Sequence, residues 1–222
     1  MYRAKIKKLI SCRLCRLVML VSSFLLIQSI FGTTQASNNA QEARDIFNRT
    51  YQMVFGPQGS TLHYDVNIIG IYKTAGDICY KGKKMRYGEE RYASWNDGVT
   101  AYMVDKKSKK VSIYRADSDK KDKYLSKFKF NLNDFEYSWR QAKEGFQVNM
   151  KLKHASFMGI REVEGFIDRK TYYPLSLRIK VAFFWTTVKI SGFRSGDISD
   201  QIFVFPQHQF KGYQIIDCRN EK

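Results

Sequence analysis

The chain has 222 residues, and 38 Lys and Arg residues against 21 Asp and Glu residues give it a formal net charge of +17. This length suits one domain with a substantial core and predicts no second domain. The basic balance is typical of a solvated surface, or of a protein that meets acidic membranes or acidic partners.

The N-terminus has the order of a secretory signal peptide. Six basic residues precede the apolar run 17–31, and the small-residue site Thr34-Gln35-Ala36 follows it. We therefore expect residues 1–36 to be a signal peptide, and its cleavage after Ala36 would lower the net charge from +17 to +11. The mature protein, residues 37–222, is then a single domain outside the cytoplasm, for which nucleic acid is not an expected partner.

Two other interpretations of this N-terminal segment compete with cleavage. An uncleaved membrane anchor is disfavoured because the apolar run is shorter than the roughly 20 residues that a span needs. Lipidation at Cys12 is suggested by Leu9-Ile10-Ser11-Cys12, but this stretch lies before the apolar run instead of at its end.

One helix is predicted from about Ala40 to Gly56-Pro57. A Ser or Asn among residues 37–39 can cap its first turn, and Gly-Pro supplies a typical stop. Apolar residues recur at helical spacing along one stripe: Ala43, Ile46, Phe47, Tyr51, Val54 and Phe55.

Beyond the helix the hydrophobic period changes to two, which indicates antiparallel strands. Leu62, Tyr64 and Val66 alternate with polar residues before a bulge expected near Ile69-Gly70, and Asn96-Asp97-Gly98 predicts a hairpin turn. The lysine-rich loop 106–110 makes the next turn and is either solvated or a docking patch. Segment 117–133 is expected to be a loop or short helix. Strands are expected at about 62–68, 78–80, 84–87, 91–95, 99–104, 111–114, 135–139, 146–152, 162–168, 174–193, 202–205 and 213–218.

The stretch from Pro174 to Phe193 is too long for an ordinary strand and should fold back on itself as a hairpin. Its expected tip carries three aromatic residues, Phe183, Phe184 and Trp185, instead of turn-forming residues. We interpret this tip as a docking site for a membrane or a partner. The alternative is a bent strand whose aromatic residues enter the core.

So much sheet against one helix creates a packing problem, because one helix covers only part of an antiparallel sheet. Strand 99–104 also carries apolar residues on both parities. Two architectures satisfy this pattern: a sandwich of two layers, or a curved sheet that wraps an apolar cavity with the helix across its mouth.

Catalytic and metal-binding patterns are not found in the sequence. His63, His154 and His208 are scattered without metal-ligand spacing, and neither a nucleophile elbow nor a Gly-rich phosphate loop occurs. Cys79 and Cys218 are the two cysteines that remain after signal-peptide cleavage. They either form a disulfide, which an oxidising compartment permits, or stay as two buried thiols.

Two stretches in the first half of the chain resemble the outer-membrane lipoprotein carrier family, LolA. Within residues 76–114, Asp97-Gly98, Thr100 and Tyr102 match a family motif in which Asp-Gly precedes an aromatic-rich strand. The preceding strand ends in a basic turn, as it does in the family.

Two later stretches extend the resemblance over nearly the whole mature chain. Asp168 and the strand 175–179 match an Asp-containing turn and the strand after it. Asp197 to Pro206, with Phe203 and Phe205 in place, matches the closing Asp-x-x-Phe-x-Phe-x-Pro pattern. The signal peptide and the leading helix also agree with the family.

The resemblance implies an incomplete antiparallel barrel, closed by helices, whose apolar concave face shelters the acyl chains of lipoproteins. The chain departs from the family at one turn, where an arginine followed by Pro-Gly helps hold the lid closed. The matching residues here are Lys81-Gly82, without the proline. A lysine is a point charge and does not reproduce a guanidinium fork, so a latch of the usual kind is in doubt.

We accordingly expect a mainly β (α+β) fold. A curved antiparallel sheet would form an incomplete barrel around an apolar cavity, covered by the N-terminal helix and by short helical lid segments. The candidate ligand-binding residues lie on the helix stripe and on the sheet: Ile46, Phe47, Tyr51, Val54, Trp95, Tyr102, Val104 and Ile179.

The first functional hypothesis is a non-enzymatic, monomeric periplasmic carrier that uses neither cofactor nor metal. It would take acylated lipoproteins or lipids from an inner-membrane release complex to an outer-membrane acceptor, with transient contact to membrane surfaces. The alternative is a periplasmic binding or scaffold protein of the same fold for another hydrophobic ligand, or for none. A secreted hydrolase with an unrecognised active site is the third hypothesis.

Overall fold

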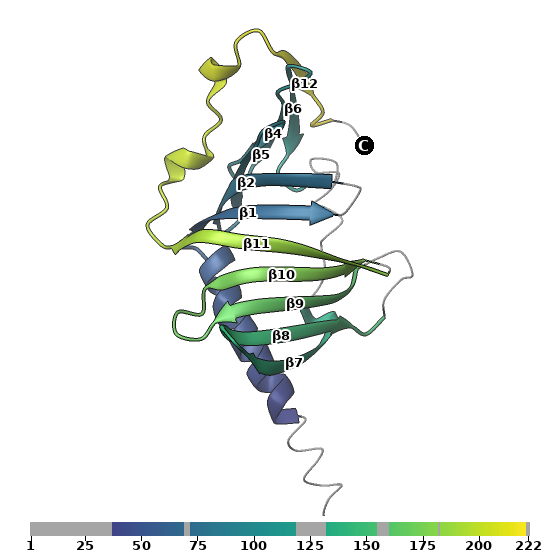
Figure 1. Cartoon of the computed structure of the whole chain (residues 1–222). Helices are drawn as coiled ribbons and strands as arrows, with labels where there is room; N and C mark the ends of the chain where they lie inside the picture. Colours follow the sequence, from purple (N-terminus) through teal and green to yellow (C-terminus); the bar gives the residue numbers. More distant parts are fainter. Residues whose placement is uncertain (1–36, 69–71, 119–131, 155–159, 182, 221–222) are drawn as a thin grey trace, which may run out of the picture.

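The structure, a computed structural model, describes residues 37–68, 72–118, 132–154, 160–181 and 183–220 (Figure 1). The predicted signal peptide, the bulge expected near Ile69-Gly70 and most of segment 117–133 lie outside these residues. Within the described part of the chain, no helix is long and apolar enough to cross a membrane.

Residues 37–55 are helical, and twelve strands follow. The described residues also include three short 3-10 helices: η3 (Leu132–Asp134), η4 (Asp200–Phe203) and η5 (Gln207–Phe210). The strands are β1 (Ser60–Ile68), β2 (Tyr72–Lys81), β3 (Lys84–Glu89), β4 (Tyr92–Asn96), β5 (Thr100–Asp105), β6 (Lys110–Arg115), β7 (Phe135–Ala142), β8 (Gly145–Leu152), β9 (Ile160–Asp168), β10 (Pro174–Val181), β11 (Phe184–Ser195) and β12 (Gln214–Asp217).

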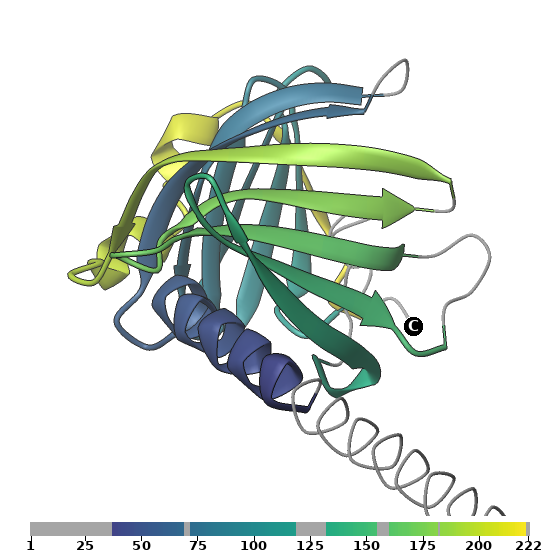
Figure 2. The same cartoon turned by 60° about the horizontal axis from the view of Figure 1, so that its bottom comes forward.

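All twelve strands belong to one sheet, in the order β12-β6-β5-β4-β3-β2-β1-β11-β10-β9-β8-β7. Neighbours are antiparallel except β12, which runs parallel to β6. Strand β1 pairs with β2 on one side and with β11 on the other, so it joins two meanders. The described strands thus form an open sheet with edges at β12 and β7, and Figure 2 shows this sheet curving over the helix. The predicted fold class is confirmed.

The helix ends where the sequence predicts. The Gly56 N–H donates to the Gln52 carbonyl at 2.9 Å. A Cβ atom at Gly56 would lie 2.2 Å from that carbonyl oxygen, so a residue with a side chain would force the chain to shift here.

Side-chain bonds explain the turn between β4 and β5. The Asn96 Oδ1 accepts from the Gly98 N–H at 2.9 Å, and the Asp97 Oδ1 accepts from the N–H groups of Val99 and Thr100, each at 2.8 Å. Gly98 has φ +97°, which favours glycine. The turn predicted from Asn-Asp-Gly is therefore present.

The last two expected strands have different outcomes. The prediction at 213–218 is confirmed by β12, whereas the strand expected at 202–205 is wrong because residues 200–203 form η4. Ser199 caps this short helix by accepting from the Gln201 N–H at 3.3 Å. Four consecutive apolar residues at 202–205 gave a strand-like pattern, but this local cap competes with extended backbone.

Cys79 and Cys218 are separate buried thiols in the structure and not disulfide partners. Cys79 lies in β2, and Cys218 follows β12 at the far edge of the sheet, beyond β6. Of the two alternatives that the sequence left open, that of two buried thiols describes the structure, and the possible disulfide is not present in it.

This arrangement predicts the outcome of thiol labelling. Protein isolated without reductant, unfolded in guanidinium and treated with a maleimide, should gain one label at Cys79 and one at Cys218. Non-reducing electrophoresis should show no compact, faster species. A product that accepts label only after reduction would contradict the prediction.

Candidate ligand-binding face

One row of paired residues shows which side of the sheet faces the helix. Val66 of β1 pairs with Val188 of β11, Val188 with Leu177 of β10, Leu177 with Gly165 of β9, and Gly165 with Val148 of β8. Paired residues point to the same side of a sheet. Val148 packs in one cluster with Ala43 and Ile46 of the helix, so the whole row lies on the helix side, which is the concave face.

The burial of the side chains decreases along this row, from β8 to β1. Val148 is 0% exposed, whereas Leu177, Val188 and Val66 are only half-buried. The concave side of the three middle strands β10, β11 and β1 is thus apolar but incompletely covered. The half-buried residues there are Tyr64, Val66, Leu177, Ile179, Val188 and Ile190.

The arm formed by β7, β8 and β9 is better covered. Its concave residues form a cluster with the first half of the helix, and most of its members are almost inaccessible: Ala43, Ile46, Phe135, Tyr137, Val148, Met150, Val163 and Ile167. At the other arm, Leu62, Ile78 and Tyr87 make a second concave cluster, flanked by half-buried Tyr64, Tyr80, Met85, Tyr92 and Met103.

Side-chain bonds hold the helix to the sheet near one end of the strands. At the C-terminal end of the helix, the hydroxyl of Ser60 donates to the Val54 carbonyl at 2.7 Å, and the hydroxyl of Ser195 donates to the Met53 carbonyl at 3.0 Å. These bonds satisfy carbonyls that a helix end leaves without partners. The hydroxyl of Thr50 donates at 2.9 Å to the Tyr172 carbonyl, in the turn between β9 and β10.

The first turns of the helix are held by β7. The Asn39 side chain accepts from the Trp139 N–H and donates to the Trp139 carbonyl, both at 3.0 Å. The indole Nε1 of Trp139 donates to Glu42 Oε2 at 2.9 Å. The helix is therefore fastened to the sheet along its length.

Five predicted ligand-binding residues lie on the concave side or on the helix that covers it. Ile46 is buried in the helix–sheet cluster, and Phe47 and Ile179 pack against that cluster as half-buried residues. The Tyr51 ring is 6.0 Å from that of Phe47 and 4.7 Å from that of Phe55, while Val54 is buried. The helix stripe was therefore predicted correctly as an inward-facing surface.

The other three predicted residues, Trp95, Tyr102 and Val104, lie on the opposite, convex face and require a correction. Tyr102 is paired with Trp95, and these side chains pack with residues of the C-terminal segment. The Phe205 ring stacks on Tyr102 with centroids 4.3 Å apart and meets Trp95 edge-on at 5.6 Å.

The physical reason is that strands β4 and β5 are covered on both faces. Residues 196–218 cross the convex side before ending beside β6, and Phe210 of η5 and Tyr213 join the cluster there. This segment explains the apolar residues on both parities of strand 99–104. At least one of the expected helical lids, η5, thus belongs to the convex side.

Lys81 anchors this C-terminal segment. Its Nζ donates to the Ile198 carbonyl at 2.8 Å and lies 3.1 Å from Asp200 Oδ1, and Lys84 Nζ lies 3.2 Å from the same oxygen. The hydrogen bonds from Lys81 and Lys84 lower the pKa of Asp200. A carboxylate with a lowered pKa contributes its stabilisation above its ordinary pKa and loses it as the pH falls through the lowered value. In this structure the side-chain bonds of Lys81 thus go to the C-terminal segment.

The aromatic tip forms the end of the β10–β11 hairpin, as predicted. Val181 pairs with Phe184, and the side chains of Phe183 and Phe184 are 66% and 71% exposed. Trp185 is half-buried. These residues do not enter the core, which excludes the alternative of a bent strand with buried aromatics.

Among the described residues, the convex side carries a polar hollow and a buried thiol. A polar hollow over β7–β9 contains Arg140, which donates to Gln147 Oε1 at 2.9 Å, beside Lys151 and Glu162. Burial raises the pKa of the Cys79 thiol, which disfavours a thiolate nucleophile. Of the residues that the structure describes, no group of three or more His, Cys, Asp or Glu side chains is placed to hold a metal ion.

No family model and no curated protein matches the sequence. A solved structure described as an uncharacterized conserved protein from Thermus thermophilus is similar, with a TM-score of 0.54 and 11% identity over 79% of this chain and 99% of that chain. The two proteins share a fold.

Two further solved structures show weaker similarity. One is a LolA superfamily protein from Nitrosomonas europaea, with a TM-score of 0.40 and 9% identity over 74% of this chain and 98% of that chain. Another is a putative outer membrane lipoprotein-sorting protein domain from Vibrio parahaemolyticus, with a TM-score of 0.41 and 9% identity over 78% and 99% of the two chains.

The residues that the sequence left unidentified are those of the middle strands, above all Val188 and Ile190 of β11. The sequence did indicate an apolar face on β1, because Tyr64 and Val66 alternate with polar residues. What was missing was the pairing of β1 with β11, which places Tyr64 opposite Ile190 and Val66 opposite Val188.

The convex position of Trp95 leads to a prediction that separates stability from binding. Trp95→Ala should lower the free energy of unfolding by about 3 to 5 kcal/mol, as truncation of a core aromatic does. The folded fraction should bind a fluorescent fatty acid as the unmodified protein does. Guanidinium unfolding and fluorescence titration measure the two quantities, and a loss of binding at unchanged stability would return Trp95 to the ligand site.

Proposed function

We propose that this protein is a periplasmic carrier that shelters the acyl chains of lipoproteins on its concave face and escorts them from the inner to the outer membrane. The observation that carries this proposal is the row from Val148 to Val66, which passes from full burial to half burial while remaining apolar. The order of LolA-like motifs along the sequence and the signal-peptide pattern support it independently.

Acyl chains need such a surface because water opposes their transfer between membranes. Exposure costs about 0.8 kcal/mol for each CH₂ group, so unassisted transit of a lipidated protein is very slow. An apolar face that its own chain leaves half-covered gains stability when an acyl chain covers it. No covalent step is required, and a carrier of this kind is not an enzyme.

The bonds of the helix bear on how a ligand enters. Moving the helix away would break its bonds from Asn39, Ser60 and Ser195, each worth about 0.5 to 1.5 kcal/mol. It would also expose Ala43, Ile46 and Val54, which are buried. We therefore propose that the helix acts as a wall, and that ligand enters over the half-covered middle strands instead of under a lifted lid. A latch at Lys81 is not needed in this scheme.

One observation favours the alternative of a binding protein for another lipid. Tyrosines are frequent among the concave side chains, including Tyr64, Tyr80 and Tyr92, and Tyr64 donates a hydrogen bond to Glu89. Hydroxyl groups on an apolar wall suit a ligand that carries polar groups as well as hydrocarbon.

Adjacent residues on β1 provide a matched test of the binding face. Val66 points to the concave side, whereas its neighbour Asn67 points to the convex side because successive side chains alternate. Val66→Glu should weaken binding of a fluorescent fatty acid at least about tenfold, since burying a carboxylate against acyl chain is costly. Asn67→Glu adds the same charge and should leave binding unchanged. Equal effects of the two changes would remove the concave face as the binding site.

Native mass spectrometry of the protein purified from its own periplasm should identify the cargo. The carrier function predicts a bound acylated polypeptide, which collisional activation releases. Bound free lipid would support the alternative, and protein that is consistently empty would count against both functions.

A further inference from the structure

The tip of the β10–β11 hairpin extends beyond the neighbouring pairing. The register of β1 with β11 runs to Asn67 opposite Thr187, so Phe184 and Trp185 lie past the last of these pairs. Figure 1 shows this hairpin projecting from one end of the sheet. Exposed side chains of Phe183 and Phe184 thus stand at the end of a paired hairpin.

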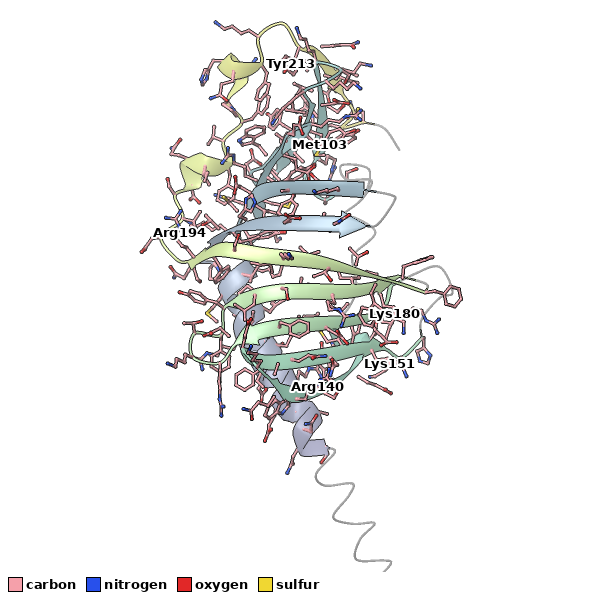
Figure 3. All side chains as sticks on the ribbon, viewed as in Figure 1. Met103, Arg140, Lys151, Lys180, Arg194 and Tyr213 are labelled. Carbon is pink, nitrogen blue, oxygen red and sulfur yellow. The ribbon has the colours of Figure 1, made fainter. Side chains whose placement is uncertain are left out.

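The hairpin is also uniformly basic. Residues 174–195 contain Arg178, Lys180, Lys189 and Arg194, and no acidic residue. Figure 3 places Lys180 near the tip and Arg194 at the opposite end of β11. Acidic side chains reach the hairpin from β9, where Glu164 lies 2.7 Å from Arg178 and Glu162 lies 2.8 Å from Lys180.

Trp185 is held in place by these same cations. The guanidinium carbon of Arg178 is 4.7 Å from the Trp185 ring centroid, and Lys180 Nζ is 5.4 Å from it. The ion pairs to β9 orient both cations beneath the ring. Trp185 therefore directly follows two exposed Phe residues in the chain, and its ring packs against two cations that are paired with Glu164 and Glu162.

We propose that this hairpin docks the protein on a bilayer surface that contains anionic lipids. Phe183 and Phe184 would enter the boundary between headgroups and acyl chains, Trp185 would lie at the headgroup level, and the cations would attract anionic headgroups. An exposed apolar patch of this kind normally marks an interaction site. A protein groove would also accept two Phe side chains, but the basic hairpin and the net charge of +11 expected for residues 37–222 favour an anionic surface.

Docking itself does not depend on the proposed carrier function, because it requires only the exposed aromatic side chains of the tip and the positive charge of the protein. The consequence of docking for the transfer of a ligand, in contrast, rests on the proposed carrier function. The bonds of Thr50, Ser60 and Ser195 hold the helix at the strand ends opposite the tip. A docked tip would therefore turn the end of the concave face that lies away from these bonds toward the bilayer.

The test is sedimentation of the naturally processed protein with lipid vesicles. One set of vesicles is pure phosphatidylcholine, and the other contains phosphatidylglycerol as about one lipid in three, which gives an anionic surface. The protein should bind the anionic vesicles and release as salt is raised. Phe183→Ser/Phe184→Ser should weaken partitioning at least about tenfold, since each Phe buries a large apolar surface. Val99→Ser/Val204→Ser is the matched control, because these residues are also strongly exposed, 79% and 56%, at other sites.

Quenching of Trp fluorescence by lipids brominated along the acyl chain gives a second readout. Quenching should be lost in Trp185→Phe, which keeps an aromatic side chain, and thermal stability should be nearly unchanged. No binding to anionic vesicles, an equal loss in the control, or quenching that survives Trp185→Phe would each overturn the proposal. If vesicles fail to bind while the Phe183→Ser/Phe184→Ser variant loses a protein partner, the tip docks a protein instead.

Discussion

The pairing of β1 with β11 is the constraint on which the rest of this structure depends. It joins the β2–β6 meander to the β7–β11 meander, so that a single curved sheet exists with one concave side. The partners are far apart in sequence, and pairs such as Tyr64 with Ile190 form only after a long loop has closed. Without this pairing the apolar residues of β1 and β11 would belong to separate sheets, and no continuous face would cross the molecule.

Coverage of that face is uneven, and the unevenness has a simple physical origin. One helix of 37–55 can cover only a few strands, and its bonds to Trp139, Tyr172 and Ser195 place it along one end of them. The arm at β7–β9 is packed like an ordinary core, whereas the middle strands keep apolar side chains half-buried. A ligand that completes this packing gains hydrophobic stabilisation without any rearrangement of the core.

Local patterns in the sequence predicted the elements well, because periodicity and turn chemistry are local. The helix stop at Gly56, the Asn96-Asp97-Gly98 turn and the hairpin around Phe183 are all present. Local patterns could not predict on which side of the sheet Trp95, Tyr102 and Val104 lie. Both sides of β4 and β5 are buried, and the residues that cover the convex side, such as Phe205, come from the end of the chain. Alternation cannot separate two faces when both are apolar.

The side chain of Asn39 has a consequence for how copies of this protein meet one another. Strand β7 lies at the edge of the sheet, and an exposed edge offers backbone groups to which a strand of another chain can add. Asn39 binds both the N–H and the carbonyl of Trp139 on that strand, as an added strand would do. The helix thus blocks edge-to-edge association at this site, which protects a sheet of this size from polymerising through β7.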